Sequence, residues 1–83
     1  MPYIKQEQRA KWDKIVEVIS KLMVEDREGE LNYFITKMLT KVYFPKYADY
    51  NKAIGLLECI KQEFYRKVVG PYEDIKEKEN GGV

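Results

Sequence analysis

The chain has no histidine and a single cysteine among its 83 residues. Histidine is the commonest general base and transition-metal ligand, so its absence disfavours most enzymes and most transition-metal sites. Cys59 has no second cysteine with which to form an intrachain disulfide, which fits a reducing compartment. No apolar run approaches the roughly 20 residues of a membrane span, and residues 1–5 lack the apolar core of a signal peptide. We therefore expect a cytoplasmic protein that does not bind membranes and carries no cofactor.

The composition is that of a foldable chain, with 45% apolar residues, 35% charged residues and seven tyrosines. Tyrosine has an apolar body and a polar tip, which suits interfaces and ligand pockets. A net charge of +1 argues against a dedicated nucleic-acid binder. The length predicts one domain over residues 1–78 and a flexible tail over residues 79–83.

Apolar residues recur with the helical period in three segments, and nothing in the sequence indicates a strand. In the first segment, Asp13 could cap a helix over about 14–25 that follows a short helix over 5–11, or one long helix could cover both. The second helix is expected from about 30 to 43, between Gly29 and Pro45. An aromatic connection over 44–50 is expected to pack on the helices.

The third helix is expected over about 51–69, ended by Gly70 and Pro71, with a short last helix over about 71–78. Gly55 inside the third helix indicates either a close approach by another helix or ligand, or a tolerated surface glycine. The predicted fold is all-α, a compact bundle of three main helices plus short terminal helices. Three helices of this size enclose little, so an exposed apolar seam favours a homo-oligomer.

Few residues could support catalysis. Cys59 lies on or beside an apolar stripe, so we expect it to be buried and inert. Only carboxylates could hold a metal, and Glu25 with Glu28, or Glu73 with Glu77, are spaced as ordinary solvated helix pairs. We therefore predict neither catalytic residues nor a metal site.

An aromatic and basic group is the candidate binding site. Arg66 could grip a carboxylate or phosphate, and Tyr65 could stack on a base. Asn32 and Tyr33 open the second helix, whose free N–H groups favour an anion. We predict a ligand site formed by Asn32, Tyr33, Thr36, Tyr65, Arg66 and Lys67. The alternative is that Arg66 pairs with Glu63 or with the carboxylates at 73 and 74 and ties down the last helix.

The joint pattern of several short motifs resembles a family of short, uncharacterised, all-helical proteins from bacteria, archaea and phages. The motifs are Pro2-Tyr3-Ile4, Arg9, Gly29-Glu30-Leu31-Asn32-Tyr33, Ile35-Thr36, Ile54-Gly55, Leu57-Glu58, Glu63-Phe64-Tyr65-Arg66, Pro71-Tyr72-Glu73-Asp74, Lys76 and Asn80-Gly81. This resemblance covers nearly the whole chain and implies no particular activity.

A more distant similarity is to the all-α MazG-type nucleotide pyrophosphohydrolases, in Glu25, Glu28 and the run Gly29-Glu30-Leu31. Those enzymes hold Mg²⁺ with four carboxylates, whereas Leu56 stands here where an acid is wanted. The first hypothesis is a non-enzymatic protein, from a phage or mobile element, that sequesters a small anionic, nucleotide-like ligand. The alternatives are a Mg²⁺-dependent nucleotide hydrolase using Glu25, Glu28 and Glu58, or an adaptor docked on a host protein.

Overall fold

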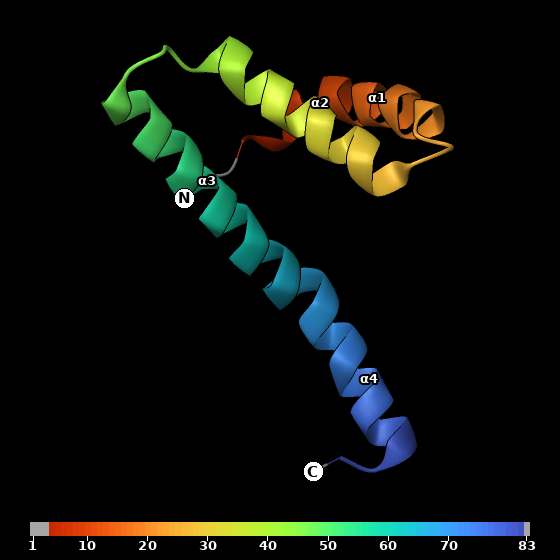
Figure 1. The fold of residues 1–83 in the computed structure, drawn as a ribbon. Coiled ribbons are helices and arrows are strands. Elements are labelled where there is room, and N and C mark those ends of the chain that lie inside the picture. Colours follow the sequence, from red (N-terminus) through yellow and green to blue (C-terminus); the bar gives the residue numbers. More distant parts are fainter. Residues whose placement is uncertain (1–3, 83) are drawn as a thin grey trace. The chain divides into compact units, whose positions relative to one another are not determined.

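The structure is a computed structural model that describes residues 4–82 of the chain. In order along the chain it contains α1 (Gln6–Leu22), α2 (Arg27–Val42), α3 (Tyr47–Phe64), a turn of π-helix, η1 (Tyr65–Val69), and α4 (Gly70–Asn80) (Figure 1). No strand occurs in the described part, so the all-α prediction is confirmed.

Internal contacts divide the chain into two units, Met1–Val42 with α1 and α2, and Tyr43–Val83 with α3, η1 and α4. That residues 1–78 fold as one domain stays a prediction. The compact core expected of a bundle is not seen, because Ala53 and Asp49 are the only buried residues between 4 and 82. In the second unit the reason is simple: α3, η1 and α4 follow one another as one helix, and the unit holds no second helix to cover its apolar side chains.

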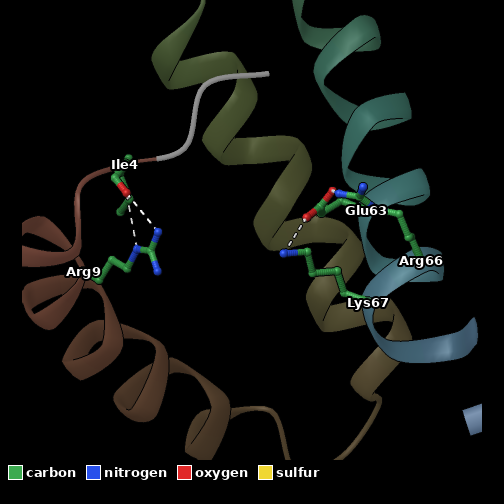
Figure 2. Close-up of polar contacts among 5 residues, drawn as sticks. All are labelled: Ile4, Arg9, Glu63, Arg66 and Lys67. Atoms are coloured by element: carbon green, nitrogen blue, oxygen red, sulfur yellow. Dashed lines mark hydrogen bonds and ion pairs between the residues drawn. The ribbon is translucent and has the colours of Figure 1, made fainter. Parts of the chain in front are cut away.

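The first helix is continuous from Gln6 to Leu22 and passes through Asp13 without a break, so the split helix is not observed. Lys5, the residue directly before the helix, makes no side-chain cap. Instead the Arg9 guanidinium reaches back to the chain ahead of the helix and donates to the Ile4 carbonyl oxygen from Nε at 3.3 Å and from Nη2 at 3.2 Å (Figure 2). Two hydrogen bonds from a planar guanidinium fix how the chain enters α1.

The second helix begins three residues earlier than expected, at Arg27. Asp26 explains the difference because its carboxylate Oδ1 accepts the Gly29 N–H at 3.1 Å and its carbonyl accepts the Glu30 N–H at 2.8 Å. A side-chain oxygen on an otherwise unpaired N–H of the first turn is an N-cap. The acidic run before Gly29 is therefore partly helical, with Gly29 inside the first turn rather than ahead of it.

The connection between the units is shorter than the expected aromatic segment, because α3 already begins at Tyr47. Tyr43 is half-buried, whereas Phe44, Tyr47 and Tyr50 are exposed, so most of these aromatics do not pack as expected. The order of this connection comes from Asp49 in the first turn of α3, whose Oδ2 accepts the Phe44 N–H at 2.9 Å. Asp49 is buried, and the sequence pattern did not single it out.

The predicted break at Gly70 and Pro71 is wrong, since the helical backbone continues from Tyr47 to Asn80 (Figure 1). The Gly70 N–H bonds to the Tyr65 carbonyl five residues back, which widens one turn immediately before Pro71. In a regular α-helix a proline lacks the donor for the carbonyl four residues earlier and its ring clashes with that carbonyl. We attribute the wide turn to this conflict, because a π turn takes up one extra residue and moves the backbone off the α register. The helix ends at Gly81, whose φ is +71°.

Part of the predicted tail is helical, because Glu79 and Asn80 belong to α4. Gly81 and Gly82 follow the helix, and Val83 lies outside the described residues.

Gly55 lies in the interior of α3 with open space around it, because in residues 43–82 no atom beyond its chain neighbours and the adjoining helical backbone comes within 4 Å of where a Cβ would stand. Within the second unit, this open space favours the interpretation of Gly55 as a tolerated surface glycine. We expect Gly55→Ala to raise the free energy of unfolding by about 1 kcal/mol, since alanine restricts the unfolded backbone and favours the helix. Urea unfolding followed by circular dichroism measures the change, and a loss of stability would instead indicate that another molecule packs on this face.

Candidate functional site

Three of the six predicted ligand residues lie on α2 in the first unit. The Thr36 hydroxyl donates to Asn32 Oδ1 at 3.3 Å, one helical turn away. The ammonium group of Lys37 lies 5.8 Å from the centroid of the Tyr33 ring, within cation–π range. All these side chains are exposed, so this face of α2 presents an aromatic ring, a cation and an amide to solvent.

The other three ligand residues lie on η1 in the second unit. The two basic ones, Arg66 and Lys67, are both paired with Glu63 at the end of α3. Arg66 Nη2 donates to Glu63 Oε2 at 2.7 Å, and Lys67 Nζ lies 3.6 Å from Glu63 Oε1 (Figure 2). The Glu63 side chain is only 26% exposed, so it is held more firmly than an ordinary surface carboxylate. The pairing of Arg66 with Glu63 is the alternative to ligand binding that the sequence left open. The two groups of ligand residues belong to different units, and a single pocket formed by both stays a prediction.

Tyr65 is bound to Glu73 across the wide turn, its hydroxyl donating to Oε1 at 2.8 Å. In a regular α-helix residues eight apart differ by about 80° around the axis, whereas residues seven apart differ by only about 20°. Because the π turn takes up one extra residue, Glu73 lies on the same face as Tyr65 although eight residues separate them. Regular helical spacing cannot predict this partner, and the sequence offered no signal for the wide turn beyond Gly70-Pro71.

The hydrogen bond to Glu73, together with the carboxylate charge, raises the pKa of Tyr65 above its ordinary value of 10.0. A raised pKa in the folded state means that the contribution to stability is complete below pH 10 and is lost as the pH rises through the raised pKa. We expect the stability difference between the wild type and Tyr65→Phe to be constant below pH 10 and to shrink above it. Urea unfolding across this range tests the expectation. Glu73→Gln, which keeps an acceptor without the charge, should show a smaller pH dependence than the wild type.

The carboxylates proposed for metal binding belong to different units of the chain. Glu28 is in the first turn of α2, whereas Glu58 lies on α3 and is paired with Lys61 at 3.1 Å and with the Gln62 amide at 3.2 Å. These contacts, the hydrogen bond from Lys61 first, lower the pKa of Glu58. Within residues 4–82 no group of three or more His, Cys, Asp or Glu is placed to hold a metal ion.

Cys59 is exposed, so the expectation that it is buried is wrong. It adjoins the apolar stripe of α3 without belonging to it, and the second unit has no other helix that would cover it. No disulfide is available to it within the chain.

A shallow, open concavity of about 610 Å³ lies along α4 and its C-terminal end, lined by Tyr72, Glu73, Lys76, Glu77, Gly81 and Gly82. Lys76 lies 5.7 Å from the Tyr72 ring centroid and 3.2 Å from Glu79 Oε2. None of the predicted ligand residues lines it, and its two carboxylates do not favour an anion.

Comparison with known proteins places the chain in a family. The model of a domain of unknown function, DUF6899, matches residues 1–83. The chain belongs to this family. The family is uncharacterised, so membership agrees with the resemblance noted in the sequence and brings no activity with it. No curated protein and no solved structure matches the chain. In the described part, no helix combines the length and apolarity needed to cross a membrane.

Proposed function

We propose that this member of the family is a non-enzymatic binding protein that acts by docking an apolar helix face on a protein surface. The supporting observation is a row of apolar side chains along the helix from α3 to α4. We call this row the C-terminal seam: Leu57, Ile60, Phe64, Val68, Tyr72 and Ile75. Leu57 is half-buried, and the other five side chains are 48% to 59% exposed. A contiguous apolar row is uncommon on a monomeric protein and marks a contact surface.

The seam lies on one face of the helix, and the wide turn falls within it. Successive members are three or four residues apart, the spacing of one helical face. Three consecutive spacings of four, from Ile60 to Tyr72, would drift by about 120° around a regular helix, and the π turn takes up one extra residue within them. The bond between Tyr65 and Glu73 supports this geometry, since it joins two residues that a regular helix would separate.

The polar contacts favour a protein surface over a small anion. Arg66 and Lys67, the cations expected to grip a ligand, both contact Glu63, and Tyr65 donates to Glu73. A ligand would have to displace these contacts before binding, which lowers its affinity. Apolar contact through the seam leaves these polar contacts in place.

Affinity capture with the full chain as bait tests the proposal, with Tyr72→Glu as the matched bait. We expect the wild type to retain one stoichiometric protein, either a second copy or another protein, and Tyr72→Glu to lose it. Equal retention by both baits, or no retained protein, would contradict docking through the seam.

A small anionic ligand is the second candidate, favoured by the exposed Tyr33 ring beside Lys37. A stacking ring beside a cation suits a nucleotide, and sequestration of such a ligand would fit the phage or mobile-element setting implied by the sequence resemblance. A thermal-shift screen of nucleotides and cyclic dinucleotides tests it. A stabilisation that is lost in both Tyr33→Ala and Arg66→Ala would support it, and no shift with any compound would count against it.

The MazG-like hydrolase is the enzymatic alternative. Release of pyrophosphate from a nucleoside triphosphate with Mg²⁺, lost in Glu28→Gln, would contradict the non-enzymatic proposal. The separation of Glu28 and Glu58 into different units gives this alternative no support from local geometry.

A further inference from the structure

We infer that the C-terminal seam binds a second copy of this chain, with the two helices packed antiparallel about a two-fold axis near Arg66 and Lys67. The inference rests on the proposed docking function and identifies its partner. It follows from the order of apolar and charged residues along the helix, which is self-complementary when one copy is reversed.

The apolar residues pair with one another in such an arrangement. Leu57 would face Ile75 of the second copy, Ile60 would face Tyr72, and Phe64 would face Val68, and all three pairs are centred on residue 66. Each pair recurs by the two-fold symmetry, so every residue of the seam has an apolar partner. The same mutual insertion of residues spaced three and four apart stabilises coiled coils.

Charges along one flank of the seam obey the same symmetry. They alternate in sign in the order Glu58, Lys61, Glu73 and Lys76, and all four side chains are exposed. They share a flank because Glu58 contacts Lys61 and because Tyr65, four residues beyond Lys61, contacts Glu73. The alternation − + − + becomes + − + − on reversal, so an antiparallel copy meets opposite charges at these four positions.

The charged pairs have nearly the same centre as the apolar ones. Glu58 would face Lys76 of the second copy and Lys61 would face Glu73, both centred on residue 67, about 1.5 Å along the axis from the apolar centre. A parallel, in-register pairing would instead place each charged residue opposite the same residue of the second copy, so that like charges would meet. On the other flank, Lys67 would lie close to the two-fold axis and therefore close to Lys67 of the second copy. The ion pair of each Lys67 with its own Glu63 would offset the repulsion between the two ammonium groups.

The area is sufficient for a specific contact. The five exposed members of the seam present roughly 100 Å² each, about half of a large apolar side chain. Pairing two seams would therefore remove on the order of 1,000 Å² from solvent before the flanking charges are counted, which reaches the lower limit of specific interfaces.

Sedimentation equilibrium of the full chain is the first test. We expect the wild type to dimerise and Val68→Lys, at the centre of the seam, to weaken dimerisation at least about 100-fold, as burying an unpaired ammonium group requires. Val18→Lys, which replaces an exposed valine of α1, is the matched control and should dimerise as the wild type does. A wild type that is monomeric at all concentrations would overturn the inference. Docking on another protein would still be decided separately by affinity capture.

Charge reversal tests the flank. The double variant Lys61→Glu with Lys76→Glu makes all four positions acidic, and Glu58→Lys with Glu73→Lys makes all four basic. We expect each double variant alone to be mostly monomeric and an equimolar mixture to form a heterodimer, with circular dichroism confirming that both remain helical. Unchanged self-association of either double variant would contradict the charge pairing.

Cysteine cross-linking tests the orientation. In a Cys59→Ser background, a mixture of Lys61→Cys and Glu73→Cys chains should form a disulfide-linked dimer under mild oxidation. Neither variant should do so alone, since each cysteine then lies roughly 18 Å along the axis from its symmetry mate. Cross-linking of each variant with itself would indicate a parallel pair, and no cross-link in any mixture would place the contact elsewhere; either result overturns the antiparallel arrangement.

Discussion

Deletion of Lys67 should destabilise the helix from Tyr47 to Asn80 by about 3 kcal/mol, and adding Pro71→Ala should restore most of the loss. The wide turn holds one residue more than an α turn, so removing one residue lets the backbone return to the α register. Pro71 would then stand inside a regular helix, where its ring meets the carbonyl of the preceding turn. Alanine at this position has no such conflict and supplies the missing N–H.

The deletion leaves the faces of the helix aligned, because Tyr65 and Glu73 become seven residues apart and the seam keeps regular spacings of three and four. Stability is measured by urea unfolding at one fixed protein concentration, since association contributes to it. Lys67→Ala is the control and should cost less than about 0.5 kcal/mol, because the Lys67 side chain is exposed and its ion pair with Glu63 contributes little. An equal cost of the deletion with proline and with alanine at position 71 would show that Pro71 is not the cause of the wide turn.

Replacement of Asp49 by alanine should cost about 2 kcal/mol of unfolding free energy. Asp49 is one of two buried residues in the described part, and its carboxylate accepts the Phe44 N–H at 2.9 Å. Its loss would leave a part-buried donor without its partner and remove a negative charge from the first turn of α3. The connection over residues 43–46 should then loosen, which hydrogen exchange of the Phe44 amide would detect.

Two variants separate the contributions at this position. Asp49→Asn keeps an acceptor oxygen and loses the charge, so we expect about 0.5 to 1 kcal/mol from the helix dipole alone. Asp74→Ala removes an exposed aspartate from α4 and should change stability by less than about 0.5 kcal/mol. If Asp49→Ala changes the free energy of unfolding by no more than Asp74→Ala does, the hydrogen bond from Phe44 to Asp49 does not stabilise the fold measurably.

The helices could be predicted wherever a local pattern determines them. The apolar period placed α2 and α3 within a few residues of their observed bounds, and Pro45 correctly separated them. The errors occur where a side chain acts on backbone several residues away. Asp26 moved the start of α2, Asp49 ordered the connection, and Asp13 did not cap a helix although its residue type allows it.

The candidate site was predictable in its residue types and not in its contacts. The sequence indicated that Arg66 either binds a ligand or pairs with a nearby carboxylate, and the structure places it on Glu63. It could not indicate that Tyr65 meets Glu73, because that contact exists only if one turn is wider than the α-helix. Cys59 was misjudged for a related reason, since burial depends on which helix covers a face.

By itself, the sequence determined that this protein is all-α, that its helices carry apolar stripes, and that it lacks the histidines and paired cysteines of common catalytic and metal sites. These properties follow from composition and from a period that each segment satisfies alone. Only the three-dimensional structure decided that α3 and α4 are one helix and that a π turn at Tyr65–Val69 brings Tyr65 and Glu73 together. The physical reason is that a proline conflict can be resolved by breaking a helix or by widening it. The choice depends on contacts such as Tyr65 with Glu73 that form only once the whole helix is in place.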